Sequence, residues 1–382
     1  MLLPDSPAPW SNTAARYFGP VLRTMDTLGH SITVVAPIRN QTQLHEAEEY
    51  LLGTQVRLRC FPAPSPKPMV ERKIRSVIRS GWELTKSEFG DAVRRELERS
   101  YDVVLAEMAE TARVVEEDPR TVLSLHHLRY IDLAGAPTGG IKSQIERLQA
   151  RRSELSTCRR VSRIRTTSER LRNLLSREGV NTDSVVPICV DSSLYERVGS
   201  PSVPTIGVLG SMFWWPSRLA AKHFVERIAP RLKAARPNVR LLVGGWQAHK
   251  FLTPYLRDDS IELLDCFPDP RDAFSRLSVL VYAPPVGTGM KVKVLEAMAY
   301  GVPVVANSEG YEGLEVDATA PVRLAVTDDE IVDNVLALLD DERNRQRVIH
   351  EGIACVQRSF SPEKVAGQLV DFFQQKKGLW NA

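Results

Sequence analysis

The chain has 382 residues, of which 25% are charged and 43% apolar, and its formal net charge is +3. These proportions are those of a globular protein and exclude a disordered chain, while the length favours two domains. No apolar run approaches the roughly 20 residues that cross a bilayer, and the start of the chain lacks the basic flank and apolar stretch of a signal peptide. The five cysteines are scattered and odd in number, which indicates reduced thiols and a cytoplasmic protein.

Strand-like and helix-like segments alternate along the chain, which predicts an α/β fold with parallel sheets. A short apolar run, Met1–Leu3, comes first. The segment 61–68 carries four prolines and is expected to be an exposed loop. In the first half, strands are expected at 32–36, 56–60, 103–106, 121–125 and 185–187, and helices at 14–28, 70–99, 141–161 and 168–178.

The second half continues the alternation and ends in a helical segment, 362–377. Residues 191–204 mix serine, glycine and proline with charge, which is typical of a linker. The chain is therefore divided into domains at 1–190 and 203–361, with 191–202 between them. Strands of the second domain are expected at 205–209, 240–243, 261–264, 279–282 and 303–306.

Residues 279–306 hold the most informative pattern in the chain. Val279–Tyr282 is apolar and mostly β-branched, as expected for a strand buried on both faces. Gly287 and Gly289 allow a tight turn, and the helix formers of 290–300 follow. Gly301 stands where a left-handed C-cap belongs, just before a proline. A helix that begins after a glycine turn presents free N–H groups, so this segment is expected to bind phosphate.

Lys293 and Glu296 lie on one face of that predicted helix because they are three residues apart. Glu296 is seven residues beyond Gly289, about 10 Å along the axis, which suits a diphosphate at the helix end and a ribose at the carboxylate. The alternative is an ordinary surface ion pair. A dinucleotide dehydrogenase shares the glycine turn and would use Glu309 for the ribose, but Val292 occupies its third glycine position.

Residues 287–306 resemble the donor-site signature of retaining glycosyltransferases of family 4, in the form G-T-G-x-K-x-K. Those enzymes have the GT-B fold, in which two Rossmann-like domains face each other across a cleft. Further segments resemble the family in the expected order: 28–35, 186–191, 208–216, 241–245 and 360–361. The resemblance implies an N-terminal acceptor domain at 1–190, a nucleotide-sugar domain at 203–361, and a last helix, 362–382, that packs back on the first domain.

The resemblance also implies a donor site, in which Lys293 and the helix end offset the charge of the departing diphosphate. His126 follows the strand 121–125 and is either a structural histidine or a residue that faces the sugar. The implied donor-binding residues are Gly210, Ser211, Gly244, Gly245, Gly287, Thr288, Gly289, Met290 and Glu296.

Three departures from the family pattern stand out. Many members carry two glutamates as E-x7-E, but the first falls here at Thr288, so the sugar must be held differently. The usual basic pair is missing from the loop 211–216, and the next basic residues are Arg218 and Lys222. The first loop of the family often carries a Gly-Gly pair that approaches the donor phosphate, but this chain has Ser11 and Asn12 there, with Arg16 one turn into the helix. Ser11 or Asn12 is either a substrate contact or a helix N-cap.

The implied activity is transfer of a hexose from a nucleotide diphosphate sugar to a hydroxyl of a glycan, a lipid-linked glycan or a small molecule, as in polysaccharide biosynthesis. The anomeric configuration would be retained by a front-face route. The sequence has no D-x-D motif, so no metal is expected, nor any cofactor besides the nucleotide sugar. A nucleotide-sugar 2-epimerase of the same fold and a non-catalytic GT-B regulator are the alternatives.

The stretch Lys142–Arg177 contains eleven Lys and Arg residues against three Glu. It is either a pair of solvated helical faces or a surface attracted to anionic lipid or to a phosphorylated acceptor. The second interpretation predicts a cytoplasmic enzyme with peripheral membrane contact. A nucleic-acid partner is not expected because no aromatic residues are interleaved with the charges.

Overall fold

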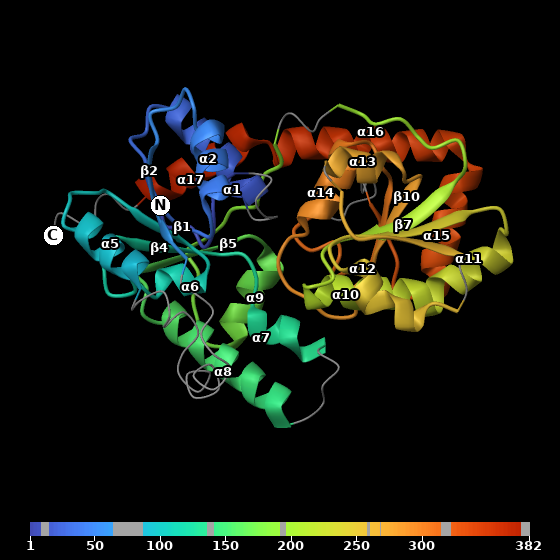
Figure 1. Cartoon of the computed structure of the whole chain (residues 1–382), viewed down its shortest axis with the longest axis horizontal. Coiled ribbons are helices and arrows are strands. Elements are labelled where there is room, and N and C mark those ends of the chain that lie inside the picture. The colour runs from blue at the N-terminus through green and yellow to red at the C-terminus, as the bar shows by residue number, and fades with distance from the viewer. Residues whose placement is uncertain are drawn as a thin grey trace. The chain divides into compact units, whose positions relative to one another are not determined.

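The computed structural model describes residues 1–8, 15–63, 87–135, 141–191, 196–257, 260–267, 269–314 and 322–375. They form two compact units (Figure 1). Unit 1 comprises Met1–Tyr130, Thr138–Asp191 and Pro362–Ala382, and unit 2 comprises Ile131–Pro137 and Ser192–Ser361. Every strand pair in both units is parallel, which confirms the predicted α/β class.

The sheet of unit 1 is joined through its first residues. Leu2 forms parallel bridges to both Val35 and Ala106, so it connects the pair β1-β2 with the four-stranded order β3-β4-β5-β6. The strands are β1 (Thr33–Ile38), β2 (Arg57–Pro62), β3 (Val104–Glu107), β4 (Thr121–Leu125), β5 (Arg163–Thr166) and β6 (Ser184–Val185).

Helices cover this sheet, and the last helix contacts the first. Phe372 of that last helix lies in an apolar cluster with Leu105 and Val122 of the sheet. The predicted helix 70–99 is described only from residue 87, and the loop beyond 63 lies outside the described residues, as do Ser11 and Asn12. The helices are α1 (Ala15–Thr27), α2 (Gln41–Tyr50), α5 (Glu88–Leu97), α6 (Ala109–Ala112), α7 (Arg129–Asp132), α8 (Ile141–Cys158), α9 (Glu169–Arg177) and α17 (Pro362–Gln374), with a 3-10 turn η1 (Leu133–Gly135).

Strand β5 was not expected, because two of its four residues are arginines. The structure buries both of them. Arg163 stacks 4.0 Å from the Phe372 ring and donates to its carbonyl at 2.5 Å. Arg165 donates to the carbonyls of Val186, at 2.7 and 3.0 Å, and Pro187, at 2.9 Å. Buried charge is tolerated when it is hydrogen-bonded, and the acceptors of these two arginines come from other segments of the chain.

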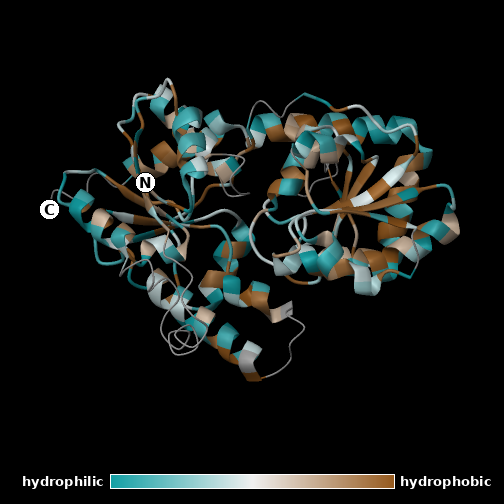
Figure 2. Cartoon of the chain, in the orientation of Figure 1, coloured by the Kyte–Doolittle hydropathy of each residue, from teal (hydrophilic) through white to brown (hydrophobic). Residues whose placement is uncertain are grey.

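Unit 2 is a six-stranded sheet with helices on both faces (Figure 1) and with predominantly apolar strands (Figure 2). Its strands are β7 (Thr205–Leu209), β8 (Arg240–Gly244), β9 (Ile261–Leu264), β10 (Val279–Tyr282), β11 (Val304–Ala306) and the unexpected β12 (Arg323–Leu324). Its helices are α10 (Trp215–His223), the π-helical η3 (Phe224–Ile228), α11 (Ala229–Ala235), α12 (Ala248–Leu252), the 3-10 turn η4 (Thr253–Tyr255), α13 (Pro270–Ser275), α14 (Val292–Ala299), α15 (Asp328–Asp340) and α16 (Glu342–Ser359).

The strand order of unit 2 is β12-β11-β10-β7-β8-β9. From β7 the chain adds strands on one side as far as β9, and then returns to the other side of β7 with β10. The order therefore reverses between β7 and β10. In open parallel sheets, ligands bind at the carboxyl ends of the strands at such a switch point, so the loops after β7 and β10 are where a site is expected.

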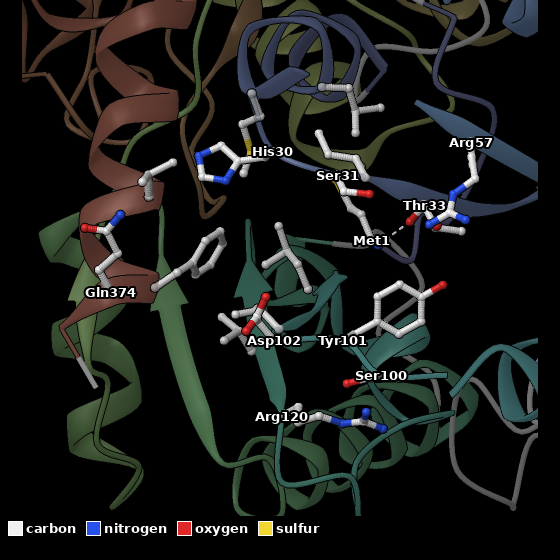
Figure 3. Close-up of a pocket in the computed structure, with 18 of the residues that line it drawn as sticks. Met1, His30, Ser31, Thr33, Arg57, Ser100, Tyr101, Asp102, Arg120 and Gln374 are labelled. Carbon is white, nitrogen blue, oxygen red and sulfur yellow. Dashed lines mark hydrogen bonds between the residues drawn. The ribbon is translucent and has the colours of Figure 1, made fainter. Parts of the chain in front are cut away.

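Unit 1 contains a cavity of about 620 Å³ (Figure 3). Its lining includes Thr33, Arg57, Val103 and Arg120, which stand at or just before the amino ends of β1 to β4. The cavity is therefore at the opposite edge of the sheet from the carboxyl ends, and the predicted site residues do not line it.

Two further predictions concern the described residues as a whole. All five cysteines lie within them, and none is joined in a disulfide. In the same ranges, no helix has both the length and the apolar character required to cross a membrane.

Candidate functional site

The glycine turn after β10 is stabilised by hydrogen bonds from a buried lysine that follows it. Gly289 is left-handed, with φ +78°, and Lys291 behind it is extended, so α14 begins at Val292 and not at Met290 as expected. The buried Lys291 ammonium donates to the carbonyls of Thr288, at 3.3 Å, and Gly289, and lies 4.0 Å from the Glu312 carboxylate. At the other end of α14, Gly301 has φ +76°, which confirms the predicted left-handed C-cap.

Lys293, on the first turn of α14, reaches the switch point. Its ammonium donates to the Ser217 hydroxyl of α10 at 2.6 Å and to the Tyr282 hydroxyl, at the end of β10, at 3.2 Å. It also lies 4.3 Å from the Tyr282 ring centroid. A Cβ atom added to Gly210, just after β7, would lie 2.6 Å from this ammonium. The cation therefore occupies the space that the missing side chain of Gly210 leaves.

The loops after β7 and β8 touch through their backbones. Gly210 donates its N–H to the Gly244 carbonyl at 2.9 Å. A Cβ atom on Gly245, which has φ +143°, would lie 2.0 Å from the Gly210 carbonyl oxygen. Ser211 follows, and its hydroxyl accepts the Phe213 N–H at 3.4 Å. Predicted donor-binding residues from both loops are thus brought together, with little room for side chains between them.

The turn itself is capped by an aspartate that the sequence analysis missed. The Asp132 carboxylate accepts the Thr288 N–H at 2.8 Å and the Thr288 hydroxyl at 3.0 Å. A Cβ atom on Gly287 would lie 3.2 Å from Pro216 and 4.0 Å from the same carboxylate oxygen. Asp132 and Thr288 are 156 residues apart in the chain, so no local pattern could have indicated the contact.

Glu296 and Met290 complete the predicted donor-binding set. Only 2% of Glu296 is exposed, so the interpretation of Lys293 and Glu296 as a surface ion pair is wrong. The Met290 side chain lies against Gly313, where an added Cβ atom would be 2.4 Å from it.

Arg218 and Lys222 of α10 are engaged within unit 2. The Arg218 guanidinium lies 4.2 Å from the Trp215 ring centroid and 3.4 Å from that of Phe251, and it donates to the Met212 carbonyl at 2.6 Å. The Lys222 ammonium lies 4.3 Å over the Tyr255 ring. These contacts account for both basic residues, so Lys293 remains the best candidate for meeting phosphate charge.

In unit 1, His126 follows β4 and contacts a buried carboxylate. Its Nε2 lies 2.6 Å from a Glu107 oxygen, at the end of β3, and 3.1 Å from the Ser124 hydroxyl. Tyr17 and Phe18 of α1 pack against the ring edge-on, at 5.1 and 5.8 Å between centroids. Because a carboxylate only accepts hydrogen bonds, Nε2 carries the proton and Nδ1 is the acceptor nitrogen in the neutral ring. The role of His126 toward a sugar stays a prediction, as does that of Arg16 on α1.

The buried Glu107–His126 pair favours one protonation state. Burial lowers the pKa of His126 and outweighs the opposing effect of Glu107, while the charges of Arg165 and His127 lower it further. Burial by itself would raise the pKa of Glu107, but the hydrogen bond from His126 and the charge of Arg165 oppose burial, and the pKa is lowered. The pair is therefore a neutral imidazole on an ionised carboxylate.

Comparison with known proteins agrees with this architecture. The family model described as Glycosyl transferases group 1 matches residues 203–341. The chain is similar to the solved structure of sucrose-phosphate synthase from Thermosynechococcus elongatus, with 15% identity, a TM-score of 0.69 and 98% of each chain covered.

The chain is also similar to HepE of Anabaena in complex with UDP and glucose, with 14% identity, a TM-score of 0.69 and 98% of each chain covered. A glycosyltransferase from Rickettsia africae matches at 11% identity and a TM-score of 0.57, over 98% of this chain and 97% of that one. No curated protein sequence matches the chain. The structural matches confirm the expected GT-B fold.

The lowered pKa values predict how unit 1 responds to acid. Below about pH 6.5, the ordinary pKa of histidine, His126 becomes protonated in the unfolded chain but stays neutral in the folded one, because its pKa there is lowered. The free energy of unfolding therefore declines as the pH falls. Ionised Glu107 adds a loss of the same sign at lower pH. We expect thermal unfolding midpoints to fall less between pH 7.5 and 5.5 in His126→Gln than in the wild type. The exposed-histidine variant His45→Gln should behave as the wild type, and equal losses in all three proteins would contradict the assignment.

Proposed function

We propose that this protein is a retaining glycosyltransferase that moves a hexose from a nucleotide diphosphate sugar to an acceptor hydroxyl. The observation that carries the proposal is the position of Lys293. Its ammonium lies at the switch point between β7 and β10, next to Gly210 and on the first turn of a helix that follows a glycine turn. A cation, a helix N-terminus and close backbone approach together suit a diphosphate.

The position of Lys293 also indicates where the ribose of the donor would bind. With the diphosphate at the start of α14, Glu296 lies one turn further along and is the candidate partner of the ribose hydroxyls. The match to Glycosyl transferases group 1 spans this whole region, and HepE, a structural relative of this chain, was solved with UDP and glucose. Both support a nucleotide diphosphate sugar as the donor.

The reaction would break the bond between the sugar C1 and the diphosphate oxygen and form a bond from C1 to the acceptor oxygen. Negative charge grows on the leaving diphosphate, where Lys293 and the N–H groups at the start of α14 stabilise it. The acceptor hydroxyl gives its proton to the departing diphosphate on the same face of the sugar. That route retains the anomeric configuration and needs no carboxylate nucleophile.

We further propose that the acceptor is a lipid-linked glycan reached from an anionic membrane surface. Helix α8 exposes Ile141 at 78%, Ile145 at 48% and Leu148 at 65%, and this spacing places them on one face. Arg151 and Arg152 are exposed on the same helix. Apolar residues with flanking arginines are typical of helices that lie in a membrane interface.

The charge of the stretch Lys142–Arg177 contributes less than its composition suggests. Arg163 and Arg165 are buried within unit 1. Arg151 pairs with Glu178, Arg160 with Glu116 at 2.9 Å and Arg172 with Glu169 at 3.1 Å. The apolar face of α8 is therefore the stronger basis for membrane contact.

A thermal-shift panel of nucleotide sugars, followed by turnover assays with candidate acceptors, tests the function. We expect one nucleotide sugar to raise the melting temperature and to be consumed only when an acceptor is present. Consumption without an acceptor would indicate an epimerase instead, and binding without turnover on any acceptor would indicate a regulator. No binding in the whole panel would overturn the proposal.

Lys293→Met should lower kcat by about 100-fold or more, because its charge is worth most when the diphosphate leaves, and should change donor affinity much less. Single-turnover rates and calorimetric donor binding separate the two effects. Lys250→Met, at an exposed position of α12, is the control. Equal losses in rate and affinity would show that Lys293 only binds the donor.

Ile145→Ser combined with Leu148→Ser should abolish co-sedimentation with vesicles that contain anionic lipid. Leu52→Ser, which changes a leucine that is 77% exposed elsewhere in unit 1, should have no effect. Binding by the wild type should weaken as salt rises, because screening shortens the reach of the arginines to about 8 Å at physiological ionic strength. If the wild type does not sediment at low salt, the acceptor is soluble.

A further inference from the structure

One short segment from the first half of the sequence belongs to unit 2. Residues 131–135 group with that unit, and the turn η1 packs on α10, the helix that supplies Ser217 to the Lys293 ammonium. Asp132, at the end of α7, is only 2% exposed. The segment thus brings a buried carboxylate to the edge of the sheet where the proposed donor site lies.

Thr288 holds this carboxylate at a defined position. Both of its donors, the backbone N–H and the hydroxyl, point to one Asp132 oxygen, at 2.8 and 3.0 Å. Burying a carboxylate is costly unless it is hydrogen-bonded, so two donors from a single turn residue indicate a built contact. Burial raises the pKa of the Tyr282 hydroxyl. The charge of Lys291 and the hydrogen bond with Ser217 oppose this rise, and the charge of Asp132 adds to it.

The chemistry of a carboxylate restricts what it can bind here. It has about four acceptor positions and no donor when ionised, so it repels a diphosphate and requires hydroxyl or N–H groups from its ligand. The phosphates are assigned to Lys293 and the start of α14, and the ribose to Glu296. The base and the hexose remain. The base is attached to the ribose, which is assigned to Glu296, whereas the hexose is attached to the diphosphate, which is assigned to the turn that Asp132 contacts. The hexose is also the part richest in hydroxyl groups.

We propose that Asp132 is a sugar-recognition residue, whose carboxylate accepts hydrogen bonds from hydroxyl groups of the donor hexose. The inference rests on the proposed function and specifies how the sugar is held. Thr288 stands where the resembling family has a glutamate, and threonine is neutral and short. In this chain, Thr288 instead anchors a carboxylate that comes from another part of the sequence.

Two other roles for Asp132 make different predictions. As a purely structural lock on the turn, it would affect every ligand of the site alike. As an anion that occupies the turn and must be displaced by phosphate, its removal would strengthen nucleotide binding. The three roles therefore differ in how variants change the affinity for a nucleotide sugar relative to the affinity for the nucleotide alone.

The experiment is calorimetric titration with UDP and UDP-glucose, or with the matching pair that the thermal-shift panel selects. Asp132→Asn keeps the shape and one acceptor oxygen, so Thr288 can still hold it, but loses the charge. Its affinity for the nucleotide sugar should fall about ten-fold or more, since hydrogen bonds to charged groups are the strong ones. Its affinity for the nucleoside diphosphate should stay within two-fold of the wild type.

Thr288→Val removes one of the two donors and serves as the matched variant on the other side of the contact. It should weaken binding of the nucleotide sugar in the same direction as Asp132→Asn. Asp132→Asn with wild-type affinities, or with both ligands weakened alike, would overturn sugar recognition in favour of a structural lock. Tighter UDP binding in Asp132→Asn would overturn it in favour of a displaced anion. A wild type that binds no nucleotide sugar would instead overturn the proposed function itself.

Discussion

The arrangement of unit 2 depends on one cation held at the point where its strand order reverses. The Lys293 ammonium has hydroxyl partners from α10 and from the end of β10, and it takes the space above Gly210 at the end of β7. The end of β7 does not tolerate a larger residue, since a Cβ atom at Gly210 would lie 2.6 Å from the ammonium. Glycine at position 210 is therefore a consequence of where the charge must lie.

The two lysines of the turn have different tasks although they are two residues apart. Lys291 points back into the turn, where it donates to two carbonyls and faces the buried Glu312. Lys293 points forward to the hydroxyl groups at the switch point. A turn that is rigid before any ligand arrives needs no reorganisation when charge develops on a diphosphate, which is the main requirement of electrostatic catalysis.

Buried charged side chains occur in both units. Arg163 and Arg165 lie within the sheet of unit 1, Glu107 is fully buried beside His126, and Asp132 is buried against Thr288. Each is paired with donors or acceptors from distant segments. Such residues look like surface positions in a hydropathy pattern, which is why β5 and Asp132 escaped the sequence analysis and why the basic stretch around them appeared more exposed than it is.

Local patterns in the sequence determined the α/β class, the strands 205–209, 261–264 and 279–282, and the cap at Gly301, because burial on both faces and left-handed turns leave marks within a few residues. They also indicated Lys293 and the glycines after β10, whereas the glycines at the ends of β7 and β8 were indicated by the resemblance to a known family. Only the tertiary structure decided that α14 begins at Val292, that Glu296 is buried, and that Asp132 meets Thr288. Those outcomes depend on contacts between residues far apart in the chain, and hydrogen bonds of that range leave no periodicity from which they could be predicted.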